Sequence, residues 1–390
     1  MRIAISTLIV RPFKSGSNEP YLVSLIKALR AEDHQNEYVL FVTPENIDLF
    51  REAIQGSNRY ALKRVPGIGN YRIGRIFLDQ LAIPLWSRSL GADVLHYPGT
   101  VASAIRMSRP RTVVTVHYDI DEIHSPSVTW IKRRYFKILM TRTKRVAKAL
   151  IVPSTTFAAA FASRWQIPGS LLHTVYHGVE TNDRNMPLAA ENNSLLAKYG
   201  LRPGYILSVT STLPHKNLIR LLEAYAIIRS QVDEPIQLVL VGNVNPQLVR
   251  SALEGWPTKK LRKSEEGIVL TGFLSHREVA LLYRQASIEV TPSLTESSSM
   301  VVLEAIANGC PVVASDIPIH HEILGDAGLF VEPISPQMIA DACLRLLRQP
   351  SLRRELIERG RRRAGHFSWK DTAKQTLNVY RAVCGESQDD

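Results

Sequence analysis

Short apolar runs alternate with longer helix-patterned segments over most of this chain, and this alternation limits the folds that it can adopt. Runs of about five apolar residues indicate buried strands, whereas helical spacing indicates helices such as Tyr21–Arg30 and Val128–Lys148. Strands that alternate with helices predict a parallel sheet with both faces covered. In the first half the predicted strands are Ile3–Thr7, Tyr38–Val42, Asp93–Tyr97, Thr112–His117, Ala149–Pro153 and Leu172–Tyr176.

The pattern is interrupted at His177–Gly204, which is rich in Asn, Pro and charged residues, and then it restarts. Ser275 and Glu278 predict a capping box at the start of a helix that runs to Ala286. We therefore expect two successive doubly wound α/β units, whose ligands bind beyond the carboxyl ends of the strands. The strands predicted for the second unit are Tyr205–Val209, Gln237–Val241, Ile268–Thr271, Ser287–Thr291 and Pro311–Ala314.

Composition favours a globular protein of a reducing compartment. The three cysteines have no paired spacing, which disfavours a disulfide framework or a cysteine-based zinc site. The apolar start Ile3–Val10 is short and polar at Ser6 and Thr7, and no cleavage site follows, so it predicts a buried strand rather than a signal peptide. No segment approaches the roughly 18 consecutive apolar residues of a membrane span. We expect a cytoplasmic protein.

The net charge of +12 is unevenly distributed. Residues 1–180 hold 24 Lys and Arg against 13 Asp and Glu, whereas the remainder holds 24 against 23. The stretch 130–148 has eight basic residues and no acidic one, and as a helix it would place Ile131, Tyr135, Ile138 and Leu139 opposite its basic side. This is typical of an interfacial helix on an anionic membrane, with a solvated helix face as the alternative. The basic residues lack interleaved aromatic platforms, so we expect no nucleic-acid partner.

A loop with two glutamates carries the strongest functional signal. A predicted strand ends at Pro292, and a helix begins near Ser299 and stops at Gly309. Backbone N–H groups and the hydroxyls of Ser297, Ser298 and Ser299 at that helix start suit a phosphate. Glu304 lies roughly 7.5 Å further along the axis, where a ribose would lie, and Glu296 would face the sugar. The alternative is a capped helix with two solvated glutamates, but apolar neighbours surround Glu304.

A lysine after another strand gives the second signal. Lys216 opens a helix behind the predicted strand Tyr205–Val209 and the loop that begins at Ser211. This arrangement places an ammonium where a diphosphate would be neutralised.

From end to end, the chain resembles the retaining glycosyltransferases of the GT-B fold in their large fourth family. The resemblance implies two Rossmann-like domains with parallel sheets facing one cleft. Residues 1–178 would bind the acceptor, 179–366 would bind the nucleotide sugar, and a helix in 367–390 would cross back to the first domain. The segments that carry the resemblance are Gly16–Tyr21, Val113–His117, Val152–Ser154, His177–Glu180, Pro214–Asn217, Leu238–Gly242, Thr271–Leu274, the glutamate loop and Phe367–Trp369.

The resemblance also implies roles for single residues. Lys216 would bind the diphosphate and Glu304 the ribose. Glu296 would contact hydroxyls of the transferred sugar, and His117 would lie beside the reacting sugar. The remaining donor-binding residues would be Gly272, Phe273 and Leu274 at the base, Gly16 in the first domain, and Ser211, Ser297, Ser298, Ser299 and Met300. The chain departs from the family where Ser17, Ser297 and Ser299 replace glycines and Ser211 replaces an arginine, and the last change leaves Lys216 with less cationic help.

We therefore expect transfer of a hexose, with mannose favoured, from a nucleotide sugar to a glycan or lipid-linked acceptor in cell-surface polysaccharide biosynthesis. An epimerase or hydrolase of the same fold, or a non-catalytic glycan- or nucleotide-binding protein, are the alternatives. We expect no cofactor and no metal, and a place at the inner face of the cytoplasmic membrane.

Two acidic or histidine-rich motifs could suggest a metal. Asp119-Ile120-Asp121 has the D-x-D pattern of metal-dependent transferases, but it lies in a first-domain loop away from the diphosphate site. In His320-His321-Glu322, adjacent histidines on an extended segment would point opposite ways, which favours a structural or sugar-facing role.

Overall fold

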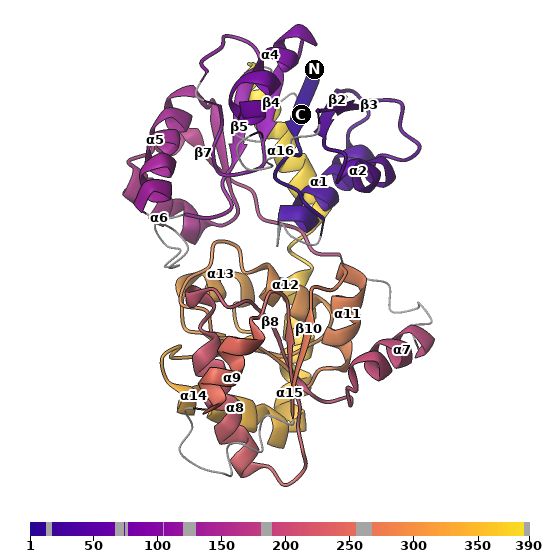
Figure 1. The fold of residues 1–390 in the computed structure, drawn as a ribbon, viewed down its shortest axis with the longest axis vertical. Helices are drawn as coiled ribbons and strands as arrows, with labels where there is room; N and C mark the ends of the chain where they lie inside the picture. The colour runs from indigo at the N-terminus through magenta and orange to yellow at the C-terminus, as the bar shows by residue number, and fades with distance from the viewer. Residues whose placement is uncertain are drawn as a thin grey trace. The chain divides into compact units, whose positions relative to one another are not determined.

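The computed structural model of this chain describes residues 1–12, 18–66, 74, 77–103, 105–119, 130–180, 189–254 and 267–385. The chain divides into two compact units (Figure 1). The first comprises Met1–Glu122, Pro126–Gly178 and Phe367–Asp390, and the second consists mainly of Val179–His366. Among the described residues, no helix is long and apolar enough to cross a membrane.

The first unit contains a parallel sheet with the strand order β3-β2-β1-β4-β5-β6-β7. The six predicted strands are present with slightly shifted ends, but the edge strand β3 was not predicted. The side chains of β3 are mostly exposed, so its sequence lacks the apolar signal of the central strands. The strands are β1 (Arg2–Ser6), β2 (Glu37–Val42), β3 (Tyr60–Arg64), β4 (Val94–Tyr97), β5 (Arg111–Thr115), β6 (Ala149–Val152) and β7 (Leu172–Thr174).

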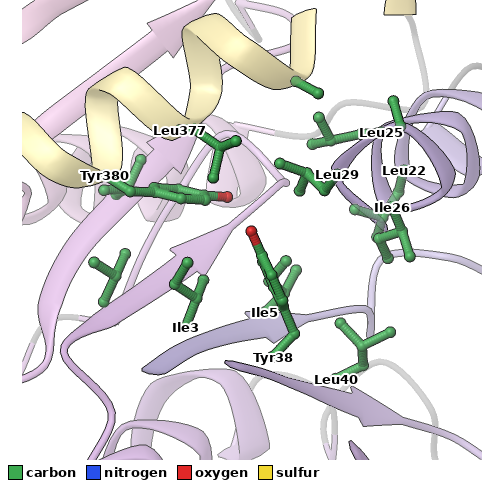
Figure 2. Close-up of a cluster of buried hydrophobic side chains, with 14 of the residues drawn as sticks. Ile3, Ile5, Leu22, Leu25, Ile26, Leu29, Tyr38, Leu40, Leu377 and Tyr380 are labelled. Carbon is green, nitrogen blue, oxygen red and sulfur yellow. The ribbon is translucent and has the colours of Figure 1, made fainter. Parts of the chain in front are cut away.

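One face of this sheet is covered by α1 (Asn18–Glu32), α2 (Ile47–Ala53) and the last helix, α16 (Trp369–Cys384). Leu377 and Tyr380 of α16 pack against apolar side chains of α1 and β1 in one buried cluster (Figure 2). The prediction that the last helix packs back on the first unit is therefore confirmed.

The backbone of the first unit also makes a close crossing at Gly178. A Cβ at this position would overlap the backbone of Ser368 and Trp369, so only glycine fits. The two ends of the first unit's chain, at Gly178 and Phe367, therefore lie against each other.

Helices α4 (Ile83–Ser89), α5 (Trp130–Val146) and α6 (Thr155–Trp165) cover the opposite face of the first sheet. Phe136 and Met140 of α5 enter that core. The expected apolar side of the helix is wrong in part, since Leu139 is buried whereas Tyr135 and Ile138 are exposed. Tyr135 and Ile138 share the exposed surface of α5 with its basic residues.

The second unit contains a parallel sheet with the order β10-β9-β8-β11-β12-β13. All five predicted strands are present, and the capping box of Ser275 and Glu278 is confirmed. The edge strand β13 was missed because it is a short run that begins with glycine. The strands are β8 (Ile206–Val209), β9 (Leu238–Val241), β10 (Ile268–Gly272), β11 (Ile288–Thr291), β12 (Val312–Ser315) and β13 (Gly328–Val331).

Helices cover both faces of the second sheet, as parallel sheets require. One face packs against α8, α9 and α14, whose apolar side chains form a continuous core with the inward residues of β8 to β13. Helices α11, α12 and α13 follow β10, β11 and β12 in turn. The helices of this unit are α7 (Ala189–Tyr199), α8 (Leu218–Gln231), α9 (Pro246–Glu254), α11 (His276–Gln285), α12 (Met300–Ala307), α13 (Pro318–Leu324), α14 (Pro336–Arg348) and α15 (Pro350–Ala364).

Candidate functional site

The strand order of the second unit reverses between β8 and β11, and the loops that follow these two strands meet there. From β8 the chain continues through β9 to β10 on one side, and from β11 it continues through β12 to β13 on the other. Such a switch point leaves a crevice beyond the carboxyl ends of the strands, where ligands bind in open α/β sheets.

Hydrogen bonds hold the two loops together. Leu294 N donates to His215 O at 2.7 Å. Asn217, which has a left-handed backbone with φ of 57°, donates from Nδ2 to Pro292 O at 3.0 Å and to Pro333 O at 2.7 Å. The Lys216 and Glu296 segments are therefore fixed against each other by a backbone hydrogen bond and by the Asn217 side-chain amide.

Lys216 and Glu296 form an ion pair in this arrangement. Lys216 Nζ donates to Glu296 Oε1 at 2.6 Å, and the two side chains are only 20% and 14% exposed. Burial by itself would raise the pKa of Glu296, but the Lys216 ammonium and hydrogen bonds from Lys216 and Ser293 lower it below its usual value. The two residues that were expected to hold different parts of a donor are thus paired with each other.

Helix α12 begins directly after this loop, and Ser299 immediately precedes it. This residue has a left-handed backbone with φ of 47°, and its hydroxyl makes no capping hydrogen bond. The Ser299 hydroxyl is buried and has no hydrogen-bond partner among the described residues. Ser297, Ser298 and Met300 are half-buried around the helix start. The first N–H groups of α12 are therefore left without a side-chain cap from Ser299, which suits an anionic ligand.

Glu304 lies on α12 and is 19% exposed. Burial raises its pKa to about 7. His276 in the first turn of α11 lies next to it, with Nδ1 3.8 Å from Glu304 Oε1. His276 was not predicted as a site residue, and its position next to Glu304 depends on the packing of two helices.

The chain bends sharply at the carboxyl end of β10. Gly272 has a φ of 74°, and its carbonyl accepts a hydrogen bond from Gly242 N at 2.9 Å. Phe273 is exposed, and Leu274 is half-buried. On the β8 side, Ser211 Oγ accepts a hydrogen bond from Leu213 N at 3.4 Å. These residues belong to the same edge of the sheet as Lys216 and Glu296, because all six strands are parallel.

A buried carboxyl group that was not predicted lies under this edge. Glu289 in β11 is fully buried, and its Oε1 accepts hydrogen bonds from Val209 N at 3.2 Å and Thr291 Oγ1 at 3.2 Å. Burial raises its pKa well above the usual value, and the charge of Glu304 adds to this effect. The carboxyl group joins the ends of β8 and β11, which separate at the switch point. The sequence signal was a single acid in an apolar strand.

The histidine pair after β12 differs from the expectation. His320 and His321 lie in the helix α13 rather than on an extended segment. They still point in different directions, since His320 is fully buried whereas His321 is half exposed. His321 Nε2 lies 2.6 Å from Asp316 Oδ1, and its ring stacks on Phe330.

In the first unit, His117 lies just beyond β5 in a cluster of aromatic rings. Its ring centroid is 4.4 Å from that of Tyr21 and 5.6 Å from that of His177, and Trp369 of α16 stacks on His177. Burial lowers the pKa of His117 to about 4, although a hydrogen bond to the Pro98 backbone opposes this. The imidazole is therefore neutral at neutral pH. The segments of Tyr21, His177 and Trp369 carried the family resemblance, but no role was predicted for these three residues.

A hydrogen-bond network connects α16 to the His117 cluster. Tyr380 of α16 lies 2.7 Å from His96 Nδ1, and His96 Nε2 lies 2.8 Å from Thr115 Oγ1. Thr115 Oγ1 is in turn 3.1 Å from the Tyr21 hydroxyl. The last helix thus helps to fix the position of Tyr21, which contacts His117.

The structure describes only part of two further predicted sites, the Gly16 loop and the motif Asp119-Ile120-Asp121. Gly16 lies outside the described residues, as do Ile120 and Asp121. Asp119 is buried, and its Oδ2 accepts hydrogen bonds from Arg164 Nη1 at 3.2 Å and Trp165 Nε1 at 3.1 Å. The Asp119 carboxylate therefore anchors α6 to the loop that follows β5.

Comparison with known proteins identifies the family. The model of the group 1 glycosyl transferases matches residues 197–363, and that of glycosyltransferase family 4 matches residues 19–183. The chain belongs to this glycosyltransferase family. The two matches cover most of both units, so the assignment rests on the whole architecture.

Several curated relatives of this glycosyltransferase are mannosyltransferases. O-antigen chain mannosyltransferase B of Escherichia coli is 33% identical over 50% of this chain and 50% of its own length. The MMP α-(1→4)-mannosyltransferase of Mycolicibacterium hassiacum is 29% identical over 69% of this chain and 64% of its own. The matched region thus spans between half and two thirds of the length of these relatives.

Solved structures confirm the GT-B fold of the glycosyltransferase. A sucrose-phosphate synthase from Thermosynechococcus elongatus aligns over 99% of this chain and 100% of its own, with a TM-score of 0.75 and 20% identity. HepE from Anabaena, solved with UDP and glucose, aligns over 98% and 100% with a TM-score of 0.72 and 17% identity. At these identities the likeness establishes the fold alone.

Proposed function

We propose that this protein transfers a mannosyl residue from a nucleotide sugar, with GDP-mannose as the preferred donor, to a glycan or lipid-linked acceptor. The anomeric configuration is retained, and the product serves cell-surface polysaccharide synthesis. The observation that carries the proposal is the group of Lys216, Glu296 and Glu304 at the switch point of the second sheet. The mannosyltransferase relatives support the sugar, and the UDP complexes of HepE support a nucleotide-linked donor.

Each part of the donor then has a partner in the second unit. The Lys216 ammonium and the uncapped start of α12 neutralise the diphosphate. Glu304 accepts hydrogen bonds from the ribose hydroxyls, and Glu296 from hydroxyls of the sugar. The backbone around Gly272 meets the base. His117 of the first unit is neutral, and it donates or accepts a hydrogen bond at the reacting sugar.

A thermal-shift panel of GDP-, UDP-, ADP- and dTDP-sugars tests the donor. A ligand that binds only the folded state at about 100 times its Kd adds about 2.7 kcal/mol to stability. We expect GDP-mannose to give the largest rise in the melting temperature of the second unit. A larger rise with another nucleotide sugar overturns the donor assignment, and the anomeric proton of the product, followed by NMR, tests retention.

The proposed reaction needs no divalent metal, because Lys216 and the start of α12 supply the positive potential at the leaving diphosphate. We expect full transfer activity in excess EDTA. Activity that disappears with EDTA and returns with Mn²⁺ contradicts this proposal.

We further propose that the protein works in the cytoplasm, with its first unit docked on the anionic inner face of the membrane. On α5, Arg134, Arg142 and Arg145 are exposed together with Tyr135 and Ile138. A second exposed apolar stripe, Phe77, Leu81 and Leu85, has a spacing of four residues and runs from the π-helix Leu78–Ala82 into α4. Both helices pack on the same face of the sheet, so their outer sides face away from it together. Basic side chains next to exposed apolar ones suit an interface that has charged headgroups above acyl chains.

Vesicle co-sedimentation tests this docking. We expect binding that requires anionic lipid, falls with salt, and is lost when Arg134, Arg142 and Arg145 become glutamine. Leu85→Ser should weaken binding without changing its salt dependence. Equal binding to neutral vesicles, or binding to neither, contradicts the proposal.

A further inference from the structure

His320 has a buried ring nitrogen whose hydrogen bond no described residue supplies. The residue is 0% exposed, and its Nδ1 lies 2.9 Å from Ser315 O and 3.1 Å from Ser315 Oγ. A carbonyl oxygen only accepts, so Nδ1 carries the proton and donates it to Ser315. Nε2 has no hydrogen-bond partner among the described residues.

The tautomer fixes what Nε2 can bind. Burial lowers the pKa of His320, although Glu296 and the Ser315 carbonyl oppose this, so the ring is neutral at neutral pH. In the neutral ring with a proton on Nδ1, Nε2 is an acceptor only. A phosphate diester oxygen cannot donate to it, whereas a hydroxyl group can. A buried acceptor that lacks a partner is costly, so the ring position calls for a donor.

Hydrogen bonds connect His320 to the Lys216–Glu296 pair. Ser315 Oγ, which contacts the imidazole, donates to Ser293 O, and the Ser293 side chain is hydrogen-bonded to Glu296. Both Glu296 and Lys216 also act electrostatically on His320. The imidazole therefore belongs to the part of the site where Glu296 meets the transferred sugar.

We propose that His320 determines donor-sugar specificity, in that its Nε2 accepts a hydrogen bond from one hydroxyl of the transferred sugar. The inference rests on the proposed function and adds a residue to it. In this structure Lys216 and Glu296 are paired with each other. When a donor turns Lys216 to the diphosphate and Glu296 to the sugar, the neighbourhood of His320 opens to a sugar hydroxyl.

Two variants of His320 test the roles of its two ring nitrogens separately. In His320→Asn the side-chain amide can still donate to Ser315 in place of Nδ1, but nothing reaches the position of Nε2. In His320→Gln the longer side chain can place an oxygen acceptor near that position. Transfer is measured with GDP-mannose and with its 2-, 3-, 4- and 6-deoxy analogues, and the binding of GDP alone is measured by calorimetry.

We expect the wild type to lose about tenfold in kcat/KM with the one deoxy analogue that lacks the bonded hydroxyl, the usual effect of one neutral hydrogen bond. With intact GDP-mannose, the kcat/KM of His320→Asn should be about tenfold below that of the wild type. With the deoxy analogue, the variant should show no further loss. His320→Gln should restore part of the discrimination. The affinity for GDP and the melting temperature should stay within twofold and about 2 °C of the wild type in the Asn variant.

His321→Gln is the matched control, because His321 is the adjacent, half-exposed histidine that pairs with Asp316. It should discriminate among the deoxy analogues as the wild type does. If His320→Asn keeps the wild-type discrimination, or loses activity equally with every analogue, His320 does not contact the sugar. If the wild type neither binds nor uses GDP-mannose, the donor assignment fails first, which is a separate result.

Discussion

The two units differ in the charge of the polar groups that their parallel sheets carry. In the first, His96, His117 and His177 are buried, and burial lowers the pKa of each, so the centre is neutral. In the second, a charged pair, Lys216 and Glu296, stands at the carboxyl edge of the sheet. The same type of parallel sheet therefore carries neutral histidines in one unit and a charged pair in the other.

The largest effect that tests this difference between the two units is expected at His117. If the first unit contributes a neutral group that acts on the reacting sugar, His117→Ala should lower kcat by about 100-fold or more and leave the donor KM nearly unchanged. Steady-state kinetics measures both constants. His173→Gln, a half-buried histidine of β7 outside the aromatic cluster, is the control. An unchanged kcat in His117→Ala removes the first unit from the chemical step.

A smaller effect, in binding rather than turnover, is expected at Glu304. Glu304→Gln should raise the donor KM by about 10- to 100-fold with little change in kcat, since hydrogen bonds to a charged acceptor are lost equally in the ground and transition states. Glu358→Gln, an exposed glutamate of α15, should behave as the wild type. A fall in kcat at constant KM would place Glu304 at the reacting centre instead.

The pKa of Glu304 gives this prediction a pH dependence. The ordinary value of 4.5 is raised to about 7 by burial, so part of the protein carries the neutral acid near pH 7. Because the carboxylate accepts hydrogen bonds more strongly, the donor KM should fall as the pH rises from 6 to 8. The folded state prefers the proton, so stability should decrease from pH 4.5 to about 7 as it is lost. The titratable groups His276, whose Nδ1 lies 3.8 Å away, and Glu289, whose pKa Glu304 influences, both face this group. Both dependences should disappear in Glu304→Gln.

A third substitution, Glu296→Gln, removes the negative charge of the Lys216–Glu296 pair. Glu296→Gln should bind GDP more tightly by about fivefold, because Lys216 no longer leaves an ion pair worth about 1 kcal/mol to meet the diphosphate. The same variant should lose transfer activity with GDP-mannose. Calorimetry with GDP measures the affinity, and weaker or equal binding means that the pair does not compete with the diphosphate.

The smallest effect is expected at Ser299, where the second unit uses a strained backbone. A left-handed backbone costs a residue with a side chain about 1–2 kcal/mol, whereas glycine adopts it freely but loses about 0.5–1 kcal/mol in chain entropy. Ser299→Gly should therefore stabilise the second unit by about 0.5 kcal/mol in urea unfolding. A destabilised variant would show that the buried Ser299 hydroxyl contributes more than the strain removes.

The sequence was sufficient for the fold because the central strands are buried on both faces and appear as continuous apolar runs. It missed β3 and β13, since edge strands need less apolar character. Lys216, Glu296 and Glu304 were found through local patterns at strand ends. The pairing of Lys216 with Glu296 could not be predicted, because 80 residues separate the two and their contact depends on the order of the strands.

The sequence also did not predict the roles of single polar residues inside apolar segments. Glu289 stands alone in an apolar strand, and His320 was considered only together with His321, for a structural or sugar-facing role that did not tell the two histidines apart. Their importance depends on which atoms the folded neighbours satisfy. Each keeps one bonded and one unbonded polar atom among the residues that the structure describes: Glu289 has a bonded Oε1 and an unpartnered Oε2, and His320 has a bonded Nδ1 and an unpartnered Nε2.

The return of α16 to the first unit has a consequence for the order in which the protein forms during synthesis. Leu377 and Tyr380 complete the core around Ile3 and Ile5, but the ribosome delivers them only after all of the second unit has been made. The second unit draws its core from one uninterrupted stretch, so it can close while translation continues. The first unit is therefore completed only after the second, and until then the apolar side chains around Ile3 and Ile5 lack the cover that α16 gives them.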